Sequence, residues 1–141
     1  MKTNAKKLMS ILSALTLSVG MVSSISANAS TTDTYWNSGY SYTRDKDNDS
    51  SIYIYNISNY YYSYVTVYGR KSGDNTDYEV NVHPSTGQTV TTHNLTLPAR
   101  QQRLVRQFIN ERGCPIAKVV FSGSGSGWWS PDSYGSYPYA N

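Results

Sequence analysis

The chain has 141 residues, of which 15% are charged and 13% aromatic, and 14 of them are tyrosines. This length suits one compact domain and excludes a multidomain machine. The low charge and high aromatic content exclude a highly charged disordered chain. No reaction can be read from these residue types, so fold and destination are what the sequence predicts first.

Residues 1–29 have the features of an export leader. A start with three lysines precedes an apolar stretch over 8–22, and Ala27-Asn28-Ala29 has the small-x-small pattern of a signal peptidase site. The apolar stretch is too short, and too often interrupted by serine and threonine, to cross a bilayer. The sequence therefore predicts a secreted, extracellular protein with no transmembrane segment.

The formal net charge of +3 comes from 12 basic and 9 acidic residues, and three of the basic ones lie in the leader. Without the leader the chain has no net charge. Nucleic-acid binding needs a basic surplus to displace counterions, so nucleic acid is disfavoured as a partner. The single cysteine, Cys114, allows no intramolecular disulfide. It is either buried as a small apolar residue, which we favour, or exposed and able to link two chains.

Segments rich in β-branched and aromatic residues follow one another from residue 51 onward. Residues 51–57 and 60–68 are predicted to be strands, and the short polar connection between them favours a hairpin. Alternation with period two predicts a third strand over 78–82 and a fourth over 88–97.

Residues 99–112 are ambiguous. Their apolar spacing, with a proline before and a glycine after, fits a helix, yet the same residues also alternate and their neighbours are strands. We prefer a strand or an irregular edge, with one short helix as the alternative. A confident strand is predicted over 114–122. Trp128 and Trp129 predict a tail that folds back, with one indole buried and the other exposed.

Short strands separated by Gly, Asn, Asp and Pro turns indicate an all-β fold. We expect an antiparallel β-sandwich, immunoglobulin-like or closed into a small barrel. The domain boundaries that follow are a signal peptide over 1–29, an N-terminal extension with an acidic loop over 30–50, the β-sandwich over 51–129, and a tail over 130–141.

Three short motifs carry a resemblance to a known group of proteins. They are Tyr64-Val65-Thr66-Val67-Tyr68-Gly69, Glu111-Arg112-Gly113 before an Ala-Lys-Val strand, and Ser126-Gly127-Trp128-Trp129-Ser130-Pro131-Asp132-Ser133. The chain resembles small secreted tyrosine-rich all-β proteins of Gram-positive bacteria that close in a Ser-Gly-x-Trp-Ser-Pro-Asp-Ser segment. The resemblance implies export and a strand rather than a helix within 99–112, and it implies no activity. Some such proteins are similar in size and leader to secreted bacteriocins.

The acidic segment Asp45-Lys46-Asp47-Asn48-Asp49 is a candidate calcium loop. Calcium needs several oxygens from one tight turn, and carboxylates at alternate positions supply them. However, the loop has Ser50 where a glycine belongs and Asn56 where a bidentate glutamate belongs. A solvated connection is the alternative. The candidate metal ligands are Asp45, Asp47 and Asp49.

The tyrosines of 60–68 are the best candidate contact surface. On a regular strand Val65 and Val67 face the core together with Tyr61, which leaves the other tyrosines outward. Such a surface suits sugar rings or a protein, because tyrosine combines apolar area with a hydroxyl. Cross-strand tyrosine pairing that only stabilises the sheet is the alternative. The predicted binding residues, forming one aromatic platform with the tyrosines of 51–57 and the terminal indoles, are Tyr53, Tyr55, Tyr60, Tyr62, Tyr64, Tyr68, Trp128 and Trp129.

The functional prediction is a secreted, non-catalytic binding or surface-interaction protein. Cell-wall material, carbohydrate or another protein surface is the expected partner, and a secreted bacteriocin-like antagonistic protein is the alternative. An enzyme is disfavoured because His83 and His93 are the only histidines, Glu79 and Glu111 the only glutamates, and no nucleophile motif accompanies them.

Overall fold

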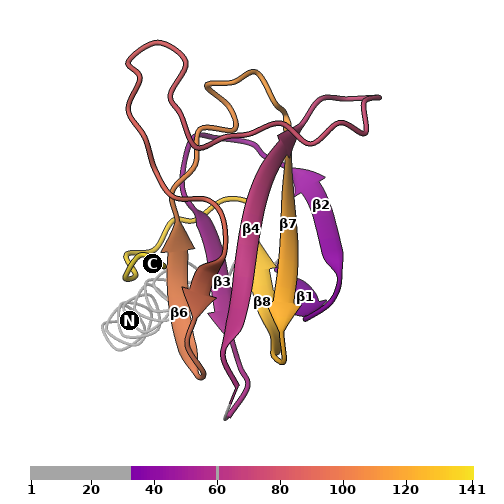
Figure 1. The fold of residues 1–141 in the computed structure, drawn as a ribbon, viewed down its shortest axis with the longest axis vertical. Helices are drawn as coiled ribbons and strands as arrows, with labels where there is room; N and C mark the ends of the chain where they lie inside the picture. The colour runs from indigo at the N-terminus through magenta and orange to yellow at the C-terminus, as the bar shows by residue number, and fades with distance from the viewer. Residues whose placement is uncertain (1–32, 60) are drawn as a thin grey trace, which may run out of the picture. The chain divides into compact units, whose positions relative to one another are not determined.

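The computed structural model describes residues 33–59 and 61–141, so the predicted signal peptide lies outside the described residues. Two antiparallel sheets of four strands each pack face to face, as Figure 1 shows, which confirms the predicted β-sandwich. Within the described part of the chain there is no helix, and hence none long and apolar enough to span a membrane. The strands are β1 (Thr34–Asn37), β2 (Ser41–Asp45), β3 (Ile52–Asn56), β4 (Ser63–Arg70), β5 (Leu95–Leu97), β6 (Gln101–Val105), β7 (Ile116–Gly123) and β8 (Ser126–Ser130).

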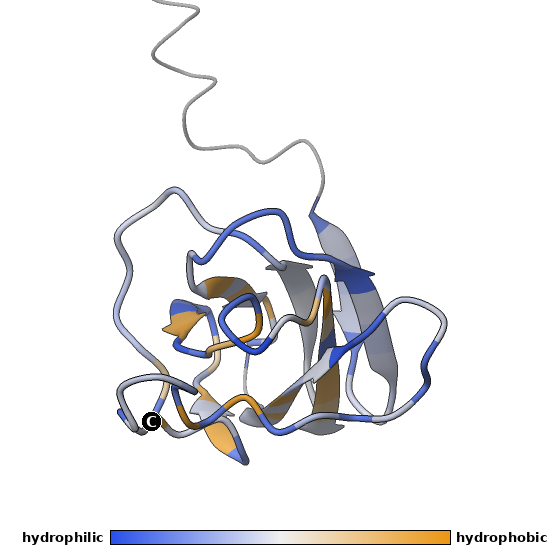
Figure 2. Ribbon diagram, turned by 90° about the horizontal axis from the view of Figure 1, so that it is seen from above, coloured by the Kyte–Doolittle hydropathy of each residue, from blue (hydrophilic) through white to orange (hydrophobic). Residues whose placement is uncertain are grey.

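The first sheet has the strand order β1-β8-β3-β6, and the second has the order β2-β7-β4-β5. Alternate residues of each strand point between the sheets, as period-two burial predicts. Trp36 of β1 stacks on Phe121 of β7 with ring centroids 4.1 Å apart, and this buried contact joins the two sheets. Figure 2 shows the hydrophobic colour mainly on strand segments and the hydrophilic colour on many of the loops.

The expected hairpin between 51–57 and 60–68 is wrong, because β3 and β4 belong to different sheets. The buried Asn56 side chain explains the crossing. Its Nδ2 donates to the carbonyls of Tyr61 (3.1 Å) and Leu97 (2.9 Å), and its Oδ1 accepts from the amide of Ser58 (3.0 Å). These bonds turn the chain from one sheet to the other at the end of the sandwich that lies lowest in Figure 1.

The predicted strands over 78–82 and 88–97 are mostly irregular. Only isolated bridges, Gly69 with Tyr78 and Val82 with Thr89, form in this region, and the regular strand is confined to β5. By contrast, β6 confirms a strand within 99–112, and β7 confirms the late strand.

The sandwich extends beyond the predicted domain limits at both ends. β1 and β2 precede residue 51 and pair with β8 and β7, so the expected extension over 30–50 supplies a strand to each sheet. The tail runs beside β6, where Leu104 donates its amide to the carbonyl of Pro138 (2.9 Å) and accepts from the amide of Ala140 (2.9 Å). The amide of Thr96 donates to the carbonyl of Asn141 (2.7 Å), which fixes the chain end to β5.

Candidate functional site

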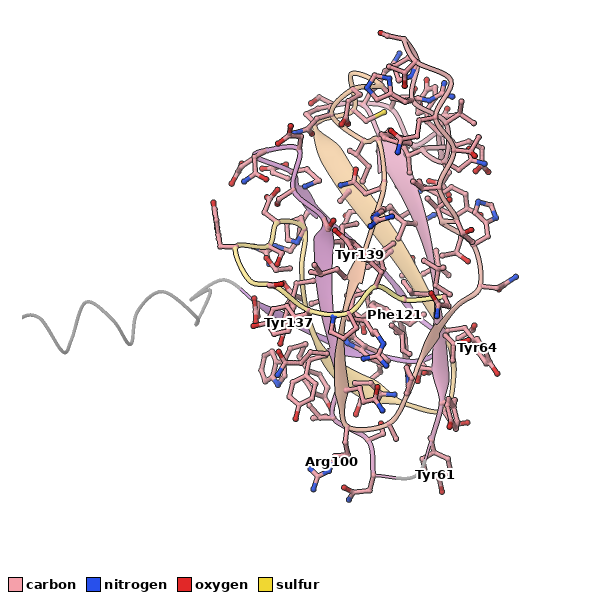
Figure 3. The ribbon with its side chains drawn as sticks, turned by 90° about the vertical axis from the view of Figure 1, so that its left-hand side faces the viewer. Tyr61, Tyr64, Arg100, Phe121, Tyr137 and Tyr139 are labelled. Atoms are coloured by element: carbon pink, nitrogen blue, oxygen red, sulfur yellow. The ribbon has the colours of Figure 1, made fainter. Side chains whose placement is uncertain are left out.

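The tyrosine-bearing strands divide between the two sheets, so the expected single platform is wrong. Tyr53 and Tyr55 lie on β3 in the first sheet, whereas Tyr64 and Tyr68 lie on β4 in the second. Their side chains point away from the core and therefore toward opposite sides of the sandwich. Figure 3 shows this separation, with Tyr64 on one side, Phe121 in the interior, and Tyr137, which packs on Tyr53, on the other.

An aromatic row crosses three neighbouring strands on the outward side of the first sheet, which we call the Trp128 face. Trp128 of β8 lies in register with Tyr35 of β1 on one side and with Tyr55 of β3 on the other. The rings of Tyr35 and Trp128 meet edge to face, with centroids 5.2 Å apart and planes 74° apart. Both side chains are 42% exposed. The row therefore presents two aromatic rings to solvent, with their planes nearly perpendicular to each other.

The backbone beneath the row is closely packed. A Cβ at Gly127 would lie 1.8 Å from the carbonyl oxygen of Tyr55 and 3.0 Å from Nε1 of Trp36, so only glycine lets β8 approach β3 this closely. Trp129, two residues after Gly127 and on the same side of β8, points inward and is fully buried. The prediction that one indole is buried and the other exposed is confirmed, and Trp129 is not available as a binding residue.

The Trp128 face continues along β3 to Tyr53, which is half-buried. Its ring packs against Tyr137 of the tail at a centroid distance of 5.1 Å. Burial, together with the neighbouring Tyr137 and Asp33, raises the pKa of Tyr53 to about 12. The Tyr53 hydroxyl therefore ionises only at a higher pH than an ordinary tyrosine.

The outward positions of the four strands in the first sheet carry no charged side chain. Register and alternation identify these positions, which differ in exposure because the tail covers Leu104 and Ser130 is buried. They hold rings, amides, hydroxyls and one aliphatic side chain: Tyr35, Asn37, Tyr53, Tyr55, Gln102, Leu104, Ser126, Trp128 and Ser130.

The second sheet has a charged outward side. Asp77 accepts hydrogen bonds from Arg70 Nε (2.6 Å) and from Lys118 Nζ. Burial alone would raise the pKa of Asp77, but these two cations outweigh it and lower the pKa. Tyr68 lies beside them, with the Lys118 ammonium 5.8 Å from its ring centroid and the His93 ring 5.3 Å away.

The remaining predicted binding residues precede β4. Tyr60 lies outside the described residues. Tyr62 is 59% exposed, but it belongs to the connection between the sheets rather than to a strand. The prediction that Tyr61 faces the core is also wrong. Its side chain is 57% exposed and lies at the same end of the sandwich as Arg100 (Figure 3).

The acidic segment is organised around a lysine and not around its own carboxylates. Lys46 is buried, and its Nζ donates to Asp132 Oδ1 (2.6 Å) and to the Ser50 carbonyl (2.7 Å). The amides of Asp47 and Asn48 also donate to the Asp132 carboxylate. Burial lowers the pKa of Lys46, and the carboxylate opposes this effect.

This arrangement does not support the calcium hypothesis. The Lys46 ammonium, and not a metal ion, binds the Ser50 carbonyl and the Asp132 carboxylate in this loop. Asp45, Asp47 and Asp49 are all exposed and do not converge. Among residues 33–59 and 61–141 no group of three or more His, Cys, Asp and Glu side chains is placed to hold a metal ion. The Asp of the Ser-Pro-Asp-Ser motif thus has a structural role in holding this loop.

The two histidines have separate partners. His93 Nε2 lies 2.8 Å from Glu79 Oε2 at an exposed position. His83 packs against the ring of Phe108, and its Nδ1 accepts from backbone amides of the following turn. Cys114 is buried, as favoured from the sequence, and burial raises the pKa of its thiol. These residues form no common site.

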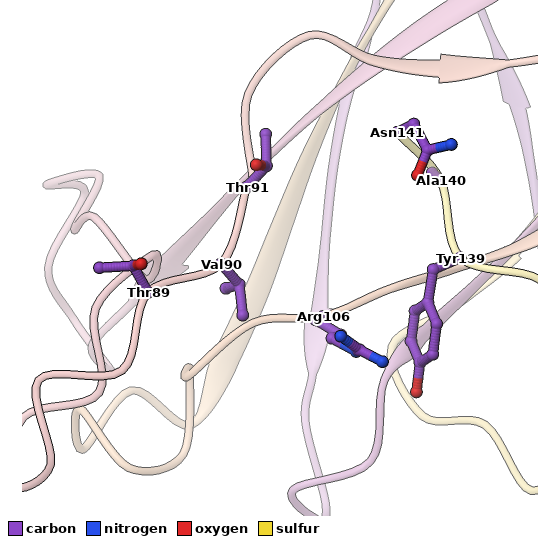
Figure 4. A pocket seen from close by; sticks show the side chains of 7 residues that line it. All are labelled: Thr89, Val90, Thr91, Arg106, Tyr139, Ala140 and Asn141. Carbon is purple, nitrogen blue, oxygen red and sulfur yellow. The ribbon is translucent and has the colours of Figure 1, made fainter.

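A hollow of about 370 Å³ lies beside the chain end, as Figure 4 shows. The Arg106 guanidinium stacks on the Tyr139 ring at 3.9 Å from its centroid, so the cation is already engaged. The other lining side chains offer hydroxyl, amide and methyl groups: Thr89, Val90, Thr91, Ala140 and Asn141. The hollow supplies no nucleophile paired with a base.

Sequence reasoning missed Tyr35 and Tyr137 as members of the Trp128 face. The signal for Tyr35 is the alternation in Thr34-Tyr35-Trp36-Asn37, which is only four residues long and precedes a segment assigned to a loop.

No family model matches this chain, and no match is found among curated proteins or solved structures.

Proposed function

We propose that this protein is a secreted, non-catalytic binding protein and that the Trp128 face is its contact surface. The observation that carries the proposal is the in-register row of Tyr35, Trp128 and Tyr55 across three neighbouring strands. Aromatic side chains bind at small entropic cost and combine apolar area with polar edges, as contact surfaces require.

The position of Trp128 strengthens this proposal. Its strand, β8, is hydrogen-bonded on both sides, by β1 and by β3, so the backbone beneath the exposed indole is held in place. A surface fixed before binding loses little conformational freedom when a partner arrives. Secretion is supported by the leader pattern of residues 1–29.

Binding to isolated bacterial cell walls and to immobilised polysaccharides and proteins tests the proposal. We expect Trp128→Ala to weaken binding about tenfold, since the loss of one stacked aromatic removes up to about 1.5 kcal/mol. Tyr64→Ala removes a ring with the same 42% exposure from the opposite side of the sandwich and should change binding less than twofold. Protein recovered from the culture medium should begin at Ser30. If Tyr64→Ala has the larger effect, the contact surface lies on the second sheet and the proposal is wrong.

A further inference from the structure

We infer that the ligand of the Trp128 face is a neutral glycan, bound by stacking of its sugar rings on Trp128 and its neighbours. This inference rests on the proposed function and names the class of ligand. It follows from three properties of the face: its in-register aromatic row, the absence of charged side chains at the outward strand positions, and its uncharged hydrogen-bonding rim.

The aromatic row fits the apolar faces of sugar rings. A pyranose presents C–H groups on its faces and hydroxyls around its edge, so it needs apolar area below and polar groups at the side. The planes of Tyr35 and Trp128 stand 74° apart, which gives a sugar ring one surface to stack on and a second that limits sliding. Tyr55 extends the aromatic surface along the row to a third strand.

The absence of charge selects against ionic ligands. No outward position of the four strands holds a cation that would pair with a sulfate, a phosphate or a uronate. A neutral glycan needs no charged group on the protein. Removing water from a charged side chain beneath it would only cost free energy. The Tyr53 hydroxyl is uncharged at neutral pH, as a phenol ordinarily is, and burial raises its pKa further, to about 12, so this residue adds no charge to the face.

The rim supplies hydrogen bonds without charge. Asn37 lies one alternate position beyond Tyr35 on β1, and Ser126 lies one alternate position beyond Trp128 on β8. Gln102 lies in register with Tyr55 on the far side of the row. Amides and hydroxyls both donate and accept, so they match the hydroxyls of a sugar.

The test measures depletion of the purified protein from solution by insoluble polymers. The neutral panel is cellulose, chitin, xylan, mannan and amylose, and the charged panel is heparin-agarose and polygalacturonate gel. We expect binding to at least one neutral glycan that persists in 1 M NaCl, because stacking on an uncharged face is not screened by salt. Trp128→Ala should weaken this binding about tenfold, and Trp128→Phe, which keeps a ring, should weaken it less.

Two measurements separate loss of binding from loss of fold. Tyr134→Ala removes a tyrosine that is 83% exposed, lies in the tail and is no part of the Trp128 row, and this variant should bind like the parent protein. Of the three tryptophans only Trp128 is exposed, so acrylamide should quench essentially this indole, and bound glycan should protect it. Trp128→Ala and Tyr134→Ala should both keep the unfolding midpoint of the parent protein.

Three outcomes overturn the inference. They are binding to the charged panel alone with loss in 1 M NaCl, neutral binding that Trp128→Ala leaves unchanged, and no binding to the neutral panel. Where the same variant abolishes binding to a protein or to a charged polymer, the proposed function stands and only the glycan assignment fails. Where no surface shows Trp128-dependent binding, both fail.

Discussion

The outward sides of the two sheets differ in chemistry, although alternate residues point outward in both. On the second sheet, Arg70 and Lys118 both donate to Asp77 from a neighbouring loop, so these two cations are paired within the protein. On the first sheet, the row through Trp128 has neither charge nor a covering loop, and its rings meet solvent. The difference teaches that exposure becomes informative only together with the neighbours of the exposed group.

Tyr64 and Trp128 make the contrast specific, because each is 42% exposed. Tyr64 lies in register with Ser122 and Thr96, which leave it a single ring among hydroxyls. Trp128 lies in register with two tyrosines, one from each neighbouring strand. Equal exposure therefore produces an isolated ring on one side and a continuous aromatic surface on the other.

Gly127→Ala should have the largest effect, because it separates the strands that carry the Trp128 face. The added Cβ would lie 1.8 Å from the carbonyl oxygen of Tyr55, and a backbone atom cannot turn away. We expect the free energy of unfolding to fall by about 4 kcal/mol, at the upper end for single substitutions. Urea unfolding followed by tryptophan fluorescence measures the loss.

Gly69→Ala is the matched variant in β4 of the second sheet. Its Cβ would meet Cβ and Sγ of Cys114 (2.8 and 2.9 Å) and Cγ1 of Val80 (3.0 Å), which is a milder overlap than the 1.8 Å approach to a carbonyl oxygen at Gly127. A loss of about 2 kcal/mol is expected, as for other overpacked cores. Equal losses for the two variants would contradict the claim that the first sheet is the more closely constrained at its glycine.

Asp132→Ala should have the next largest effect, because Asp132 joins the ends of strands from both sheets. It follows β8 of the first sheet, and its partner Lys46 follows β2 of the second. Removing the carboxylate leaves a buried ammonium with only the Ser50 carbonyl as partner, at a cost of about 3 kcal/mol. Thermal and urea unfolding check this value. Asp132→Asn keeps an acceptor for the amides of Asp47 and Asn48 and should lose less; an equal loss would show that charge alone matters.

The fold could be predicted from the sequence because burial follows a period of two. Ile52 and Ile54 alternate with tyrosines, and Val65 and Val67 alternate with tyrosines and a threonine, which fixes the inward side of each strand without knowledge of its neighbours. Which strands are neighbours could not be predicted in this way. The crossing between β3 and β4 depends on hydrogen bonds from Asn56 to Leu97, a residue 41 positions away, and no local pattern contains that information.

The candidate site could be predicted only in part, for the same reason. Trp128 and Tyr55 were recognisable as outward rings, but their grouping with Tyr35 requires the pairing of β8 with strands that lie far from it in the chain. The prediction of a calcium site in the acidic segment failed for a different reason. Its carboxylates suggested a metal, while the group that organises the loop, Asp132, lies 86 positions after the Lys46 that it binds.

The smallest expected effect is a change at low pH that is confined to the loop after β4. It distinguishes the two sides of the sandwich, because only one of them should respond. The Tyr78 hydroxyl donates to Asp74 (2.7 Å), as does the Thr76 amide (2.8 Å), and these bonds lower the pKa of Asp74 to about 2. Since an unfolded aspartate titrates near 3.9, the stabilisation is complete above about pH 5 and is lost as the pH falls toward about 2. NMR signals of Tyr78 should therefore shift over this range, while the Trp128 indole signal, with no carboxylate among the outward strand positions around it, stays constant. Asp74→Asn should abolish the Tyr78 shift, and a Trp128 signal that moves with the same midpoint would show that the two sides respond together.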